Sequence, residues 1–147
     1  MKILALLAAT LLASCSSSTY QKVPFPRQDV VVSSPSVARI YVARQSLLGS
    51  LRDLRVSDGS TEIGTISQGE YLCWERQPGR GLIVLVYEGP KVDGGDIEGL
   101  LPIECEPGQA YYYLIEIERN YKKPYGTLLD EKAGRALIAE REPAPVD

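Results

Sequence analysis

The sequence contains no histidine, and this absence excludes much of the usual enzyme chemistry. Histidine is the most frequent general base and metal ligand, so serine triads of the usual kind, histidine-zinc sites and Cys-His nucleophiles are excluded. An excess of positive charge is also lacking, because 16 Lys and Arg stand against 19 Asp and Glu. Nucleic-acid binding needs a basic patch that neutralises phosphates, and this composition argues against one. Nothing in the sequence points to a cofactor, and we expect none.

A long hydrophobic run is missing too, because the longest apolar stretch is short and lies at the start. Lys2 precedes this stretch, which covers residues 3–12 and has Thr10 as its one polar member. A membrane-spanning helix needs about 20 apolar residues, so the stretch is too short to cross a bilayer. A positive residue, an apolar stretch and small residues after it are the layout of a secretory signal peptide, which we place over residues 1–14.

The motif that ends this segment is Leu-Ala-Ser-Cys at residues 12–15, and it resembles the bacterial lipobox. In lipoproteins with this motif a peptidase cuts before the cysteine, whose thiol carries a diacylglycerol. The resemblance therefore implies lipid attachment at Cys15. Two or three acyl chains hold a protein firmly on a membrane, since each buried CH₂ contributes about 0.8 kcal/mol. The alternative is an ordinary secreted protein with a chance cysteine.

The residue after Cys15 is informative about the membrane in which the lipoprotein would be anchored. In enterobacterial lipoproteins an Asp at this position tends to mark retention in the inner membrane, whereas this chain has Ser16. By that resemblance we expect an outer-membrane lipoprotein that faces the periplasm. Residues 15–36 are then the lipidated N-terminus and a flexible tether, in which prolines interrupt regular structure. An edge strand through the valines at residues 30–32 is the alternative for part of this segment.

From residue 37 onward, short alternating segments are separated by turn signals. Strands are predicted over residues 38–44, 54–56, 61–66, 71–75, 81–87, 100–106 and 111–118. Residues 81–87 are apolar on both faces, which predicts a central strand. Turn signals about every 8–12 residues indicate an all-β sandwich or barrel. We expect a small antiparallel β-sandwich over residues 37–127.

The C-terminal residues carry a different pattern. Thr127 and Asp130 have the spacing of a capping box, and apolar residues follow at helical intervals. This pattern predicts a short helix over residues 128–140. A final strand over residues 135–140 is the competing interpretation. Residues 128–147 are thus expected to form a C-terminal helix and a tail.

Several short motifs occur together in an order that is typical of one bacterial family. They are residues 40–44, Gly49, Val56, Asp58 with Gly59, Gly64, residues 69–71, the Pro-Gly pairs at 78–79 and 107–108, and Tyr112 with Tyr113. Together they resemble the family called domain of unknown function 2846, over about residues 37–119. Its members are often lipoproteins, and the resemblance implies a small β-sandwich akin to PEGA repeats and carboxypeptidase regulatory-like domains. The family often has a His soon after the first Pro-Gly turn, where this chain has Arg80 and Gly81, and it brings no established activity.

Three cysteines are present, and an even number remains once Cys15 is acylated. In an exported chain such a remainder suggests a disulfide, here between Cys73 and Cys105. The bond requires strands that are adjacent or face each other, so that the Cα atoms approach within about 7 Å. Two buried thiols on separate strands are the alternative.

Carboxylates offer two weaker possibilities. Asp93, Asp96 and Glu98 share a glycine-rich loop, but the segment lacks the ligand order of known calcium loops, so a solvated acidic loop is favoured over a metal site. A carboxylate pair for glycoside hydrolysis would have to come from acids on the predicted strands. These acids are Glu70, Glu75, Glu104 and Glu116, and no spacing selects a pair among them. We therefore expect neither a metal site nor an enzyme.

Nine tyrosines and one tryptophan are more informative candidates for binding. Tyr111, Tyr112 and Tyr113 place rings on both faces of one predicted strand. Tyr71 and Trp74 lie on opposite faces of another. Exposed rings stack on sugars or hold a partner protein, whereas inward rings belong to the core, which is their more frequent use.

Three functions remain, and the first has the most support. It is a membrane-anchored envelope lipoprotein that acts as a non-catalytic binding or adaptor module for a periplasmic protein or for the peptidoglycan of the cell wall. The second is a purely structural envelope lipoprotein without a dedicated ligand. The third is a carboxylate-based glycan hydrolase, which needs a cleft that a single small sandwich rarely offers. Exposed aromatic residues would favour the first, and two carboxylates about 5–9.5 Å apart in a pocket would favour the third.

Overall fold

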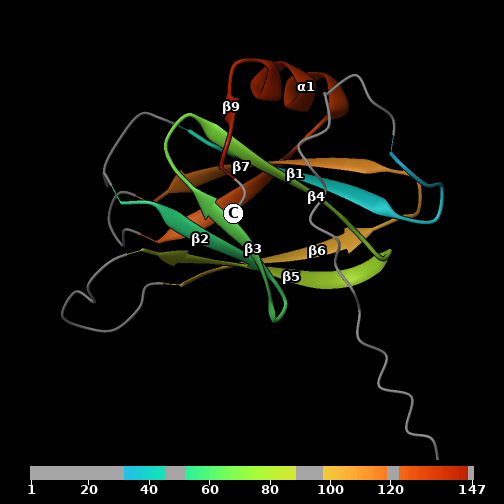
Figure 1. The fold of residues 1–147 in the computed structure, drawn as a ribbon, viewed down its shortest axis with the longest axis horizontal. Coiled ribbons are helices and arrows are strands. Elements are labelled where there is room, and N and C mark those ends of the chain that lie inside the picture. Colours follow the sequence, from blue (N-terminus) through green and yellow to red (C-terminus); the bar gives the residue numbers. More distant parts are fainter. Residues whose placement is uncertain (1–31, 46–51, 89–97, 119–122, 146–147) are drawn as a thin grey trace, which may run out of the picture.

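The structure is a computed structural model, which describes residues 32–45, 52–88, 98–118 and 123–145. These residues form two β-sheets packed face to face, with one short helix on the outer side of one sheet (Figure 1). The predicted small all-β sandwich with a short C-terminal helix is therefore confirmed.

The two sheets are called sheet A and sheet B here. Sheet A has five strands in the order β8 (Pro124–Leu129), β7 (Ala110–Ile117), β1 (Ala38–Arg44), β4 (Glu70–Arg76) and β9 (Glu142–Pro143). Sheet B has four strands in the order β3 (Thr61–Ile66), β2 (Leu54–Asp58), β5 (Gly79–Tyr87) and β6 (Glu98–Cys105). Helix α1 (Glu131–Ala139) lies against sheet A, so the molecule has three layers.

Sheet A is mixed, which adds parallel pairs to the antiparallel sandwich that the sequence predicts. β1 pairs with β4 in antiparallel orientation but with β7 in parallel, so that Arg39 lies opposite Ala110 and Arg44 opposite Ile115. β9 also joins β4 in parallel. The strand pairs in the described part of sheet B are all antiparallel. Parallel neighbours need a long connection, and the chain between β1 and β7 supplies it by forming β4 and the whole of sheet B.

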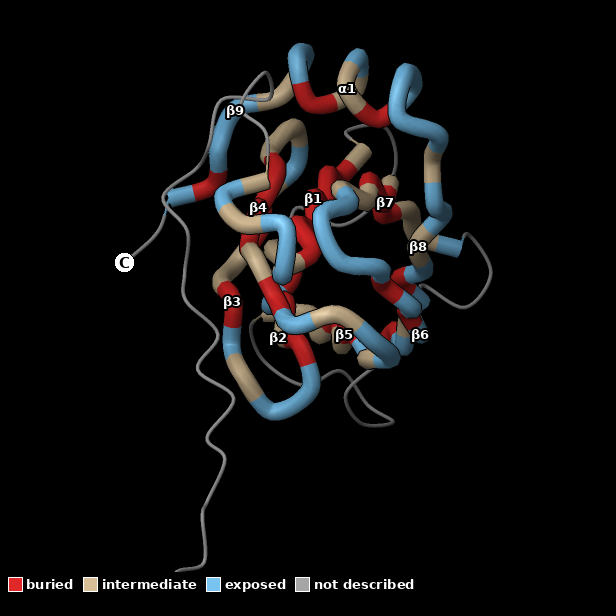
Figure 2. Tube along the Cα trace, turned by 90° about the vertical axis from the view of Figure 1, so that its right-hand side faces the viewer, coloured by how far each residue is buried: buried red, intermediate tan, exposed pale blue. Residues whose placement is uncertain are grey.

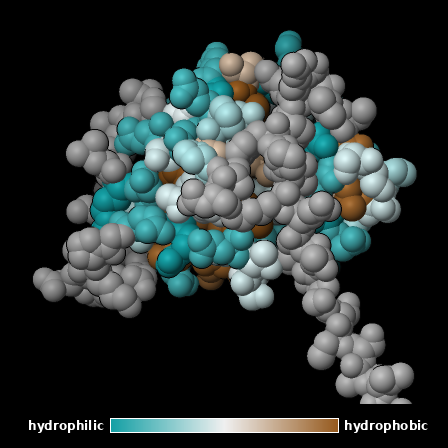
Figure 3. Space-filling model, in the orientation of Figure 1, coloured by the Kyte–Doolittle hydropathy of each residue, from teal (hydrophilic) through white to brown (hydrophobic). Residues whose placement is uncertain are grey.

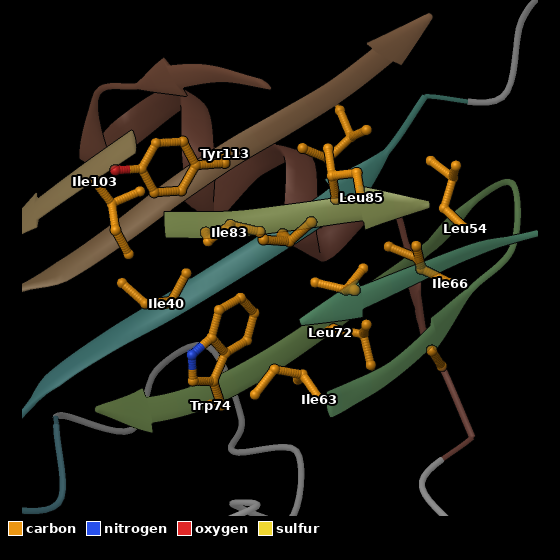
Figure 4. Close-up of a cluster of buried hydrophobic side chains, with 14 of the residues drawn as sticks. Ile40, Leu54, Ile63, Ile66, Leu72, Trp74, Ile83, Leu85, Ile103 and Tyr113 are labelled. Carbon is orange, nitrogen blue, oxygen red and sulfur yellow. The ribbon is translucent and has the colours of Figure 1, made fainter. Parts of the chain in front are cut away.

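Side chains alternate between the two faces of each strand, and those on the inner faces form the core between the sheets. Ala38, Ile40 and Val42, predicted to share one face, all lie in the core between the sheets at 0% exposure. Figure 4 shows this main core, in which Ile40 and Trp74 of sheet A meet Ile83 of sheet B. β1 is buried along its whole length (Figure 2), which means that its other face is covered as well.

A second, smaller core lies between sheet A and α1 and accounts for this coverage. The rings of Tyr41 and Tyr112 stack there with 4.8 Å between their centroids and 9° between their planes. Ile138 of α1 belongs to the same cluster, and Gly134 lets the helix approach the Tyr112 ring closely. The helix therefore buries the outer face of β1 and β7, just as sheet B buries their inner face.

The C-terminal part differs from the prediction in its boundaries. Thr127 lies in β8, and the N-cap is Asp130, whose carboxylate accepts a hydrogen bond from the Ala133 backbone N–H at 2.8 Å. The helix thus begins at Glu131 rather than at residue 128, and the alternative strand over residues 135–140 is wrong. The predicted tail is partly structured, because β9 pairs with β4 and Ala144 is 0% exposed in the main core. Both differences depend on pairing with distant strands, which the local pattern does not show.

Candidate functional site

Apolar side chains occupy the outer face of sheet B where β5 and β6 pair. They are Leu82, Val84 and Val86 of β5 with Leu100 and Pro102 of β6, and we call them the apolar patch. Leu82 is 36% exposed and Leu100 is 54% exposed. The strand register joins the members, because Leu82 lies opposite Pro102 and Val84 opposite Leu100. In Figure 3 hydrophobic surface is visible along the lower side of the molecule, the side on which β5 lies in Figure 1.

The apolar patch follows from the sequence pattern of β5. Ile83 and Leu85 point between the sheets and are 0% exposed, so the residues between and beside them point outward. β5 lies between β2 and β6, which confirms its predicted central position. A central strand has its backbone hydrogen bonds made on both edges, but its two faces are buried only if other elements pack on them. Helix α1 covers sheet A, and no element among the described residues covers the outer face of sheet B.

Charged residues border the apolar patch at both ends of its strands. Arg80 and Glu104 lie opposite each other, with 3.6 Å between Nε and Oε1. Their side chains are 88% and 72% exposed, so water screens the pair and its contribution is at most about 1 kcal/mol. At the other end lie the exposed Glu98 and an ion pair between Arg55 and Glu88 at 3.9 Å. Each end therefore carries both signs of charge.

The aromatic residues predicted for binding lie mostly inside the protein. Trp74 and Tyr113 belong to the main core at 1% and 5% exposure. Tyr71 and Tyr112 belong to the second core at 8% and 2% exposure. Tyr111 is half-buried and packs against the main core. The predicted alternation of these rings between two faces is correct, but the five rings do not form an exposed aromatic surface, because they pack into the two cores on either side of sheet A.

The candidate disulfide is not formed, because Cys73 and Cys105 are both free thiols. Cys105 lies in the main core, whereas Cys73 points to the other face of sheet A, into the second core. The alternative of two buried thiols on separate strands therefore describes the protein. Burial raises the pKa of Cys73 to about 12 and also raises the pKa of Cys105. Both stay protonated near neutral pH, a state in which a thiol is a weak nucleophile.

The carboxylates considered for hydrolysis are spread over the molecule. Glu70 and Glu75 lie on β4, Glu104 on β6 and Glu116 on β7. Glu75 is held by Arg39 at 2.7 Å and Glu104 faces Arg80, so the two belong to separate ion pairs on different sheets. Within the described ranges, no group of three or more His, Cys, Asp or Glu side chains is arranged to hold a metal ion.

Some of the predicted site residues lie outside the part of the chain that the structure describes. They are the lipid-attachment residue Cys15 and the loop acids Asp93 and Asp96. The third acid of that loop, Glu98, is exposed at the start of β6.

A buried polar network closes one end of the main core, and the sequence pattern gave no sign of it. The indole Nε1–H of Trp74 donates to the Asp58 carboxylate at 2.9 Å, and Arg76 approaches the other carboxylate oxygen at 3.4 Å. Arg76 also donates to the backbone carbonyl of Arg80 at 3.2 Å. A Cβ at Gly81 would lie 1.9 Å from Arg76 Nη1, so a larger residue here would displace the Arg76 guanidinium. Since Asp58 and Arg76 are 1% and 6% exposed, the network joins the two sheets rather than offering a site to a ligand.

A second ion pair lies on the outer face of sheet A. Arg39 donates to Glu75 at 2.7 Å, and both the backbone N–H, at 2.9 Å, and the hydroxyl of Ser33 donate to the same carboxylate. Burial by itself raises the pKa of Glu75, but the hydrogen bonds from Ser33 and Arg39 outweigh it and lower the pKa below its ordinary value. The segment that leads into β1 is therefore attached to sheet A, on the opposite side of the sandwich from the apolar patch.

No protein-family model, no curated protein and no solved structure matches the chain. The resemblance to the domain of unknown function 2846 family thus stays a prediction. In the described part of the chain, no helix has the length and apolar character that crossing a membrane requires.

Proposed function

We propose that this protein is a lipid-anchored bacterial envelope protein that acts as a non-catalytic binding or adaptor module and holds its partner at the apolar patch. The exposed outer face of sheet B is the observation that carries the proposal. Antiparallel sheets that face water on one side usually place polar residues there. The outward positions in the middle of β5 and β6 are apolar instead, and contiguous apolar surface of this kind marks interaction sites.

The anchoring part of the proposal has its support in the sequence. The signal peptide over residues 1–14 and the lipobox that ends at Cys15 support export and lipid attachment. Ser16 supports the outer membrane as the destination. The motifs shared with the domain of unknown function 2846 family support membership of a family rich in lipoproteins.

The arrangement of the sandwich agrees with such a role. Ser33, near the start of the described chain, contacts Glu75 on the outer face of sheet A. The apolar patch lies on the outer face of sheet B. A chain anchored through its N-terminus therefore keeps the apolar patch on the side away from the point where the tether joins the domain.

Site-specific photo-crosslinking of the full chain in intact cells tests the proposal. A photoreactive amino acid replaces Leu100 in the apolar patch, and in a matched control it replaces Ala136, which is exposed on α1. We expect a discrete protein adduct from position 100, none from position 136, and loss of the adduct in a Cys15→Ala variant. No adduct from position 100, or the same adduct from both positions, would contradict the proposal.

The same cells separate the alternative functions. Adducts released only after digestion of the cell wall would identify peptidoglycan as the partner. A chain that forms no adduct but is needed for envelope integrity would be a structural lipoprotein. A hydrolase would release soluble glycan fragments from purified cell wall, and we expect no such release.

A further inference from the structure

We propose that the partner held at the apolar patch is a second copy of this chain, so that the protein forms a symmetric dimer. This inference rests on the proposed function, because it names the occupant of the same surface. The pattern of side chains across β5 and β6 carries it.

Cross-strand neighbours on this surface are complementary to each other. Arg80 lies opposite Glu104, Leu82 opposite Pro102, and Val84 opposite Leu100. A twofold axis that runs between β5 and β6, parallel to both, places β5 of one copy over β6 of the other. Each side chain then meets the same kind of residue that it already has as a cross-strand neighbour in its own chain.

In this arrangement Leu82 meets Pro102 and Val84 meets Leu100 of the other copy, and each Arg80 meets a Glu104. At the opposite end of the strands Val86 meets Glu98, so the complementary part of the surface ends there. Arg80 of each copy faces Glu104 of the other, so the symmetry forms the same ion pair at two places. Both side chains are largely exposed in the single chain, at 88% and 72%, and are able to turn toward a second copy. An isologous interface requires a surface that is complementary to itself in this way.

The charges around the apolar patch favour a second copy over a lipid surface. The exposed acids Glu62, Glu98 and Glu104 outnumber the exposed bases Arg55 and Arg80 on the outer face of sheet B. Membranes that contain anionic lipids attract basic segments and repel acidic ones. A second copy instead offers Arg80 to Glu104 at two places, which the twofold axis relates to each other.

The apolar patch has five residues, whereas a specific interface commonly involves about 20–30 residues and about 800 Å² per partner. A lipid anchor compensates for this, because two copies held on one membrane meet at a high effective concentration. We therefore expect dimers on the membrane and a dissociable dimer in dilute detergent solution.

An exchange of charges between copies tests the inference. The variants Arg80→Glu and Glu104→Arg of the full chain are purified separately in detergent and then mixed. Each variant alone places like charges at both contacts of the dimer. A mixed dimer restores opposite charges between the copies, although each chain keeps its own mismatched neighbours. Sedimentation equilibrium should show about tenfold weaker dimerisation for each variant alone and near wild-type affinity for the mixture.

A control variant tests whether the effect on dimerisation is specific to the outer face of sheet B, and the crosslinking result identifies the partner. Lys132→Glu on α1 makes the same charge change as Arg80→Glu but on the other side of the sandwich, and it should leave dimerisation unchanged. A wild-type chain that stays monomeric at all concentrations, or a mixture that associates no better than its components, would overturn the dimer. If position 100 crosslinks in cells only to a different protein, the dimer is wrong and the proposed function stands. If it crosslinks to nothing or only to lipid, both are wrong.

Discussion

Asp58 and Glu75 are both carboxylates that face an arginine, but their surroundings give them different effects on stability. Asp58 is 1% exposed inside the main core, where Trp74 donates to it and Arg76 lies against it. Glu75 lies on the outer face of sheet A with its side chain 11% exposed. The first carboxylate is enclosed on all sides, so its removal leaves an arginine without its counter-charge. The second borders solvent, so its protonation can be followed by changing the pH.

We expect Asp58→Ala to destabilise the protein by about 3–5 kcal/mol, because it leaves Arg76 as an uncompensated buried charge. The measurement is the free energy of unfolding from urea denaturation at pH 7. Glu104→Ala is the matched control, since it removes the carboxylate of an exposed ion pair and should cost at most about 1 kcal/mol. Equal losses of unfolding free energy in the two variants would show that burial of the Asp58–Arg76 pair does not increase the cost of removing its carboxylate.

The lowered pKa of Glu75 predicts how Glu75→Gln behaves with pH. A group whose folded pKa is depressed contributes stability above its unfolded pKa and loses it as the pH falls through the folded pKa. Glu75→Gln should therefore cost roughly 1.5–3 kcal/mol at pH 7, the range for hydrogen bonds to a charged group. The cost should shrink below pH of about 4.3, the ordinary value for Glu. Urea denaturation at several pH values measures it, and a cost as large in strong acid as at pH 7 would contradict this account.

Among the secondary elements, α1 is the one that packs on the outer face of sheet A. Its buried residues are Gly134 and Ile138, and the helix is capped by Asp130. Gly134 is unfavourable for a helix interior on propensity alone. Its place is explained by Tyr112, because a Cβ at Gly134 would lie 2.2 Å from Cγ of that ring. The ring cannot move aside easily, since it stacks on Tyr41.

We expect Gly134→Ala to destabilise the protein by about 1–3 kcal/mol, because the added methyl group overpacks the second core. This is the opposite of what helix propensity alone predicts, since alanine favours a helix more than glycine does. Thermal unfolding followed by circular dichroism measures the change. At the exposed position 136 of the same helix, Ala136→Gly should show the ordinary preference for alanine and cost about 1 kcal/mol. A stabilised Gly134→Ala variant would show that the helix does not press on Tyr112.

At the scale of the whole molecule, α1 covers the outer face of sheet A over β1 and β7, whereas no described element covers the outer face of sheet B. Leu85 and Leu100 are both leucines of sheet B, but the first is 0% exposed and the second 54%. The stability of the fold depends on the first kind of residue, whereas the proposed association depends on the second. The two can be separated by experiment because they lie on opposite faces of the same sheet.

Leu85→Ala should lower the free energy of unfolding by about 2–5 kcal/mol, since it leaves a cavity in the main core. Leu100→Ala should change it by no more than about 0.5 kcal/mol when measured at a concentration where the chain is monomeric. The same Leu100→Ala variant should weaken association. A Leu100→Ala variant as unstable as Leu85→Ala would mean that the apolar patch is covered within the single chain.

Much of this architecture could be predicted from local patterns. Alternation and turn signals place the strands from β1 to β7, and they assign Tyr71 and Trp74 to opposite faces correctly. They do so because a strand has a side-chain period of two, which a few neighbouring residues already reveal. The C-terminal helix is predicted in kind, but its start is not, because Thr127 and Asp130 are both acceptable caps until pairing with β7 draws the first into β8.

What the sequence determined by itself is thus the two faces of the strands from β1 to β7 and the absence of histidine chemistry. The tertiary structure decided which of those faces are covered. Tyr112 and Cys73 are buried because α1 lies on the outer face of sheet A, and Leu82 and Leu100 are exposed because no described element lies on the outer face of sheet B. Local periodicity indicates that a face is apolar, but it does not indicate which element packs on that face. The reason is that packing brings together residues that are far apart in the chain.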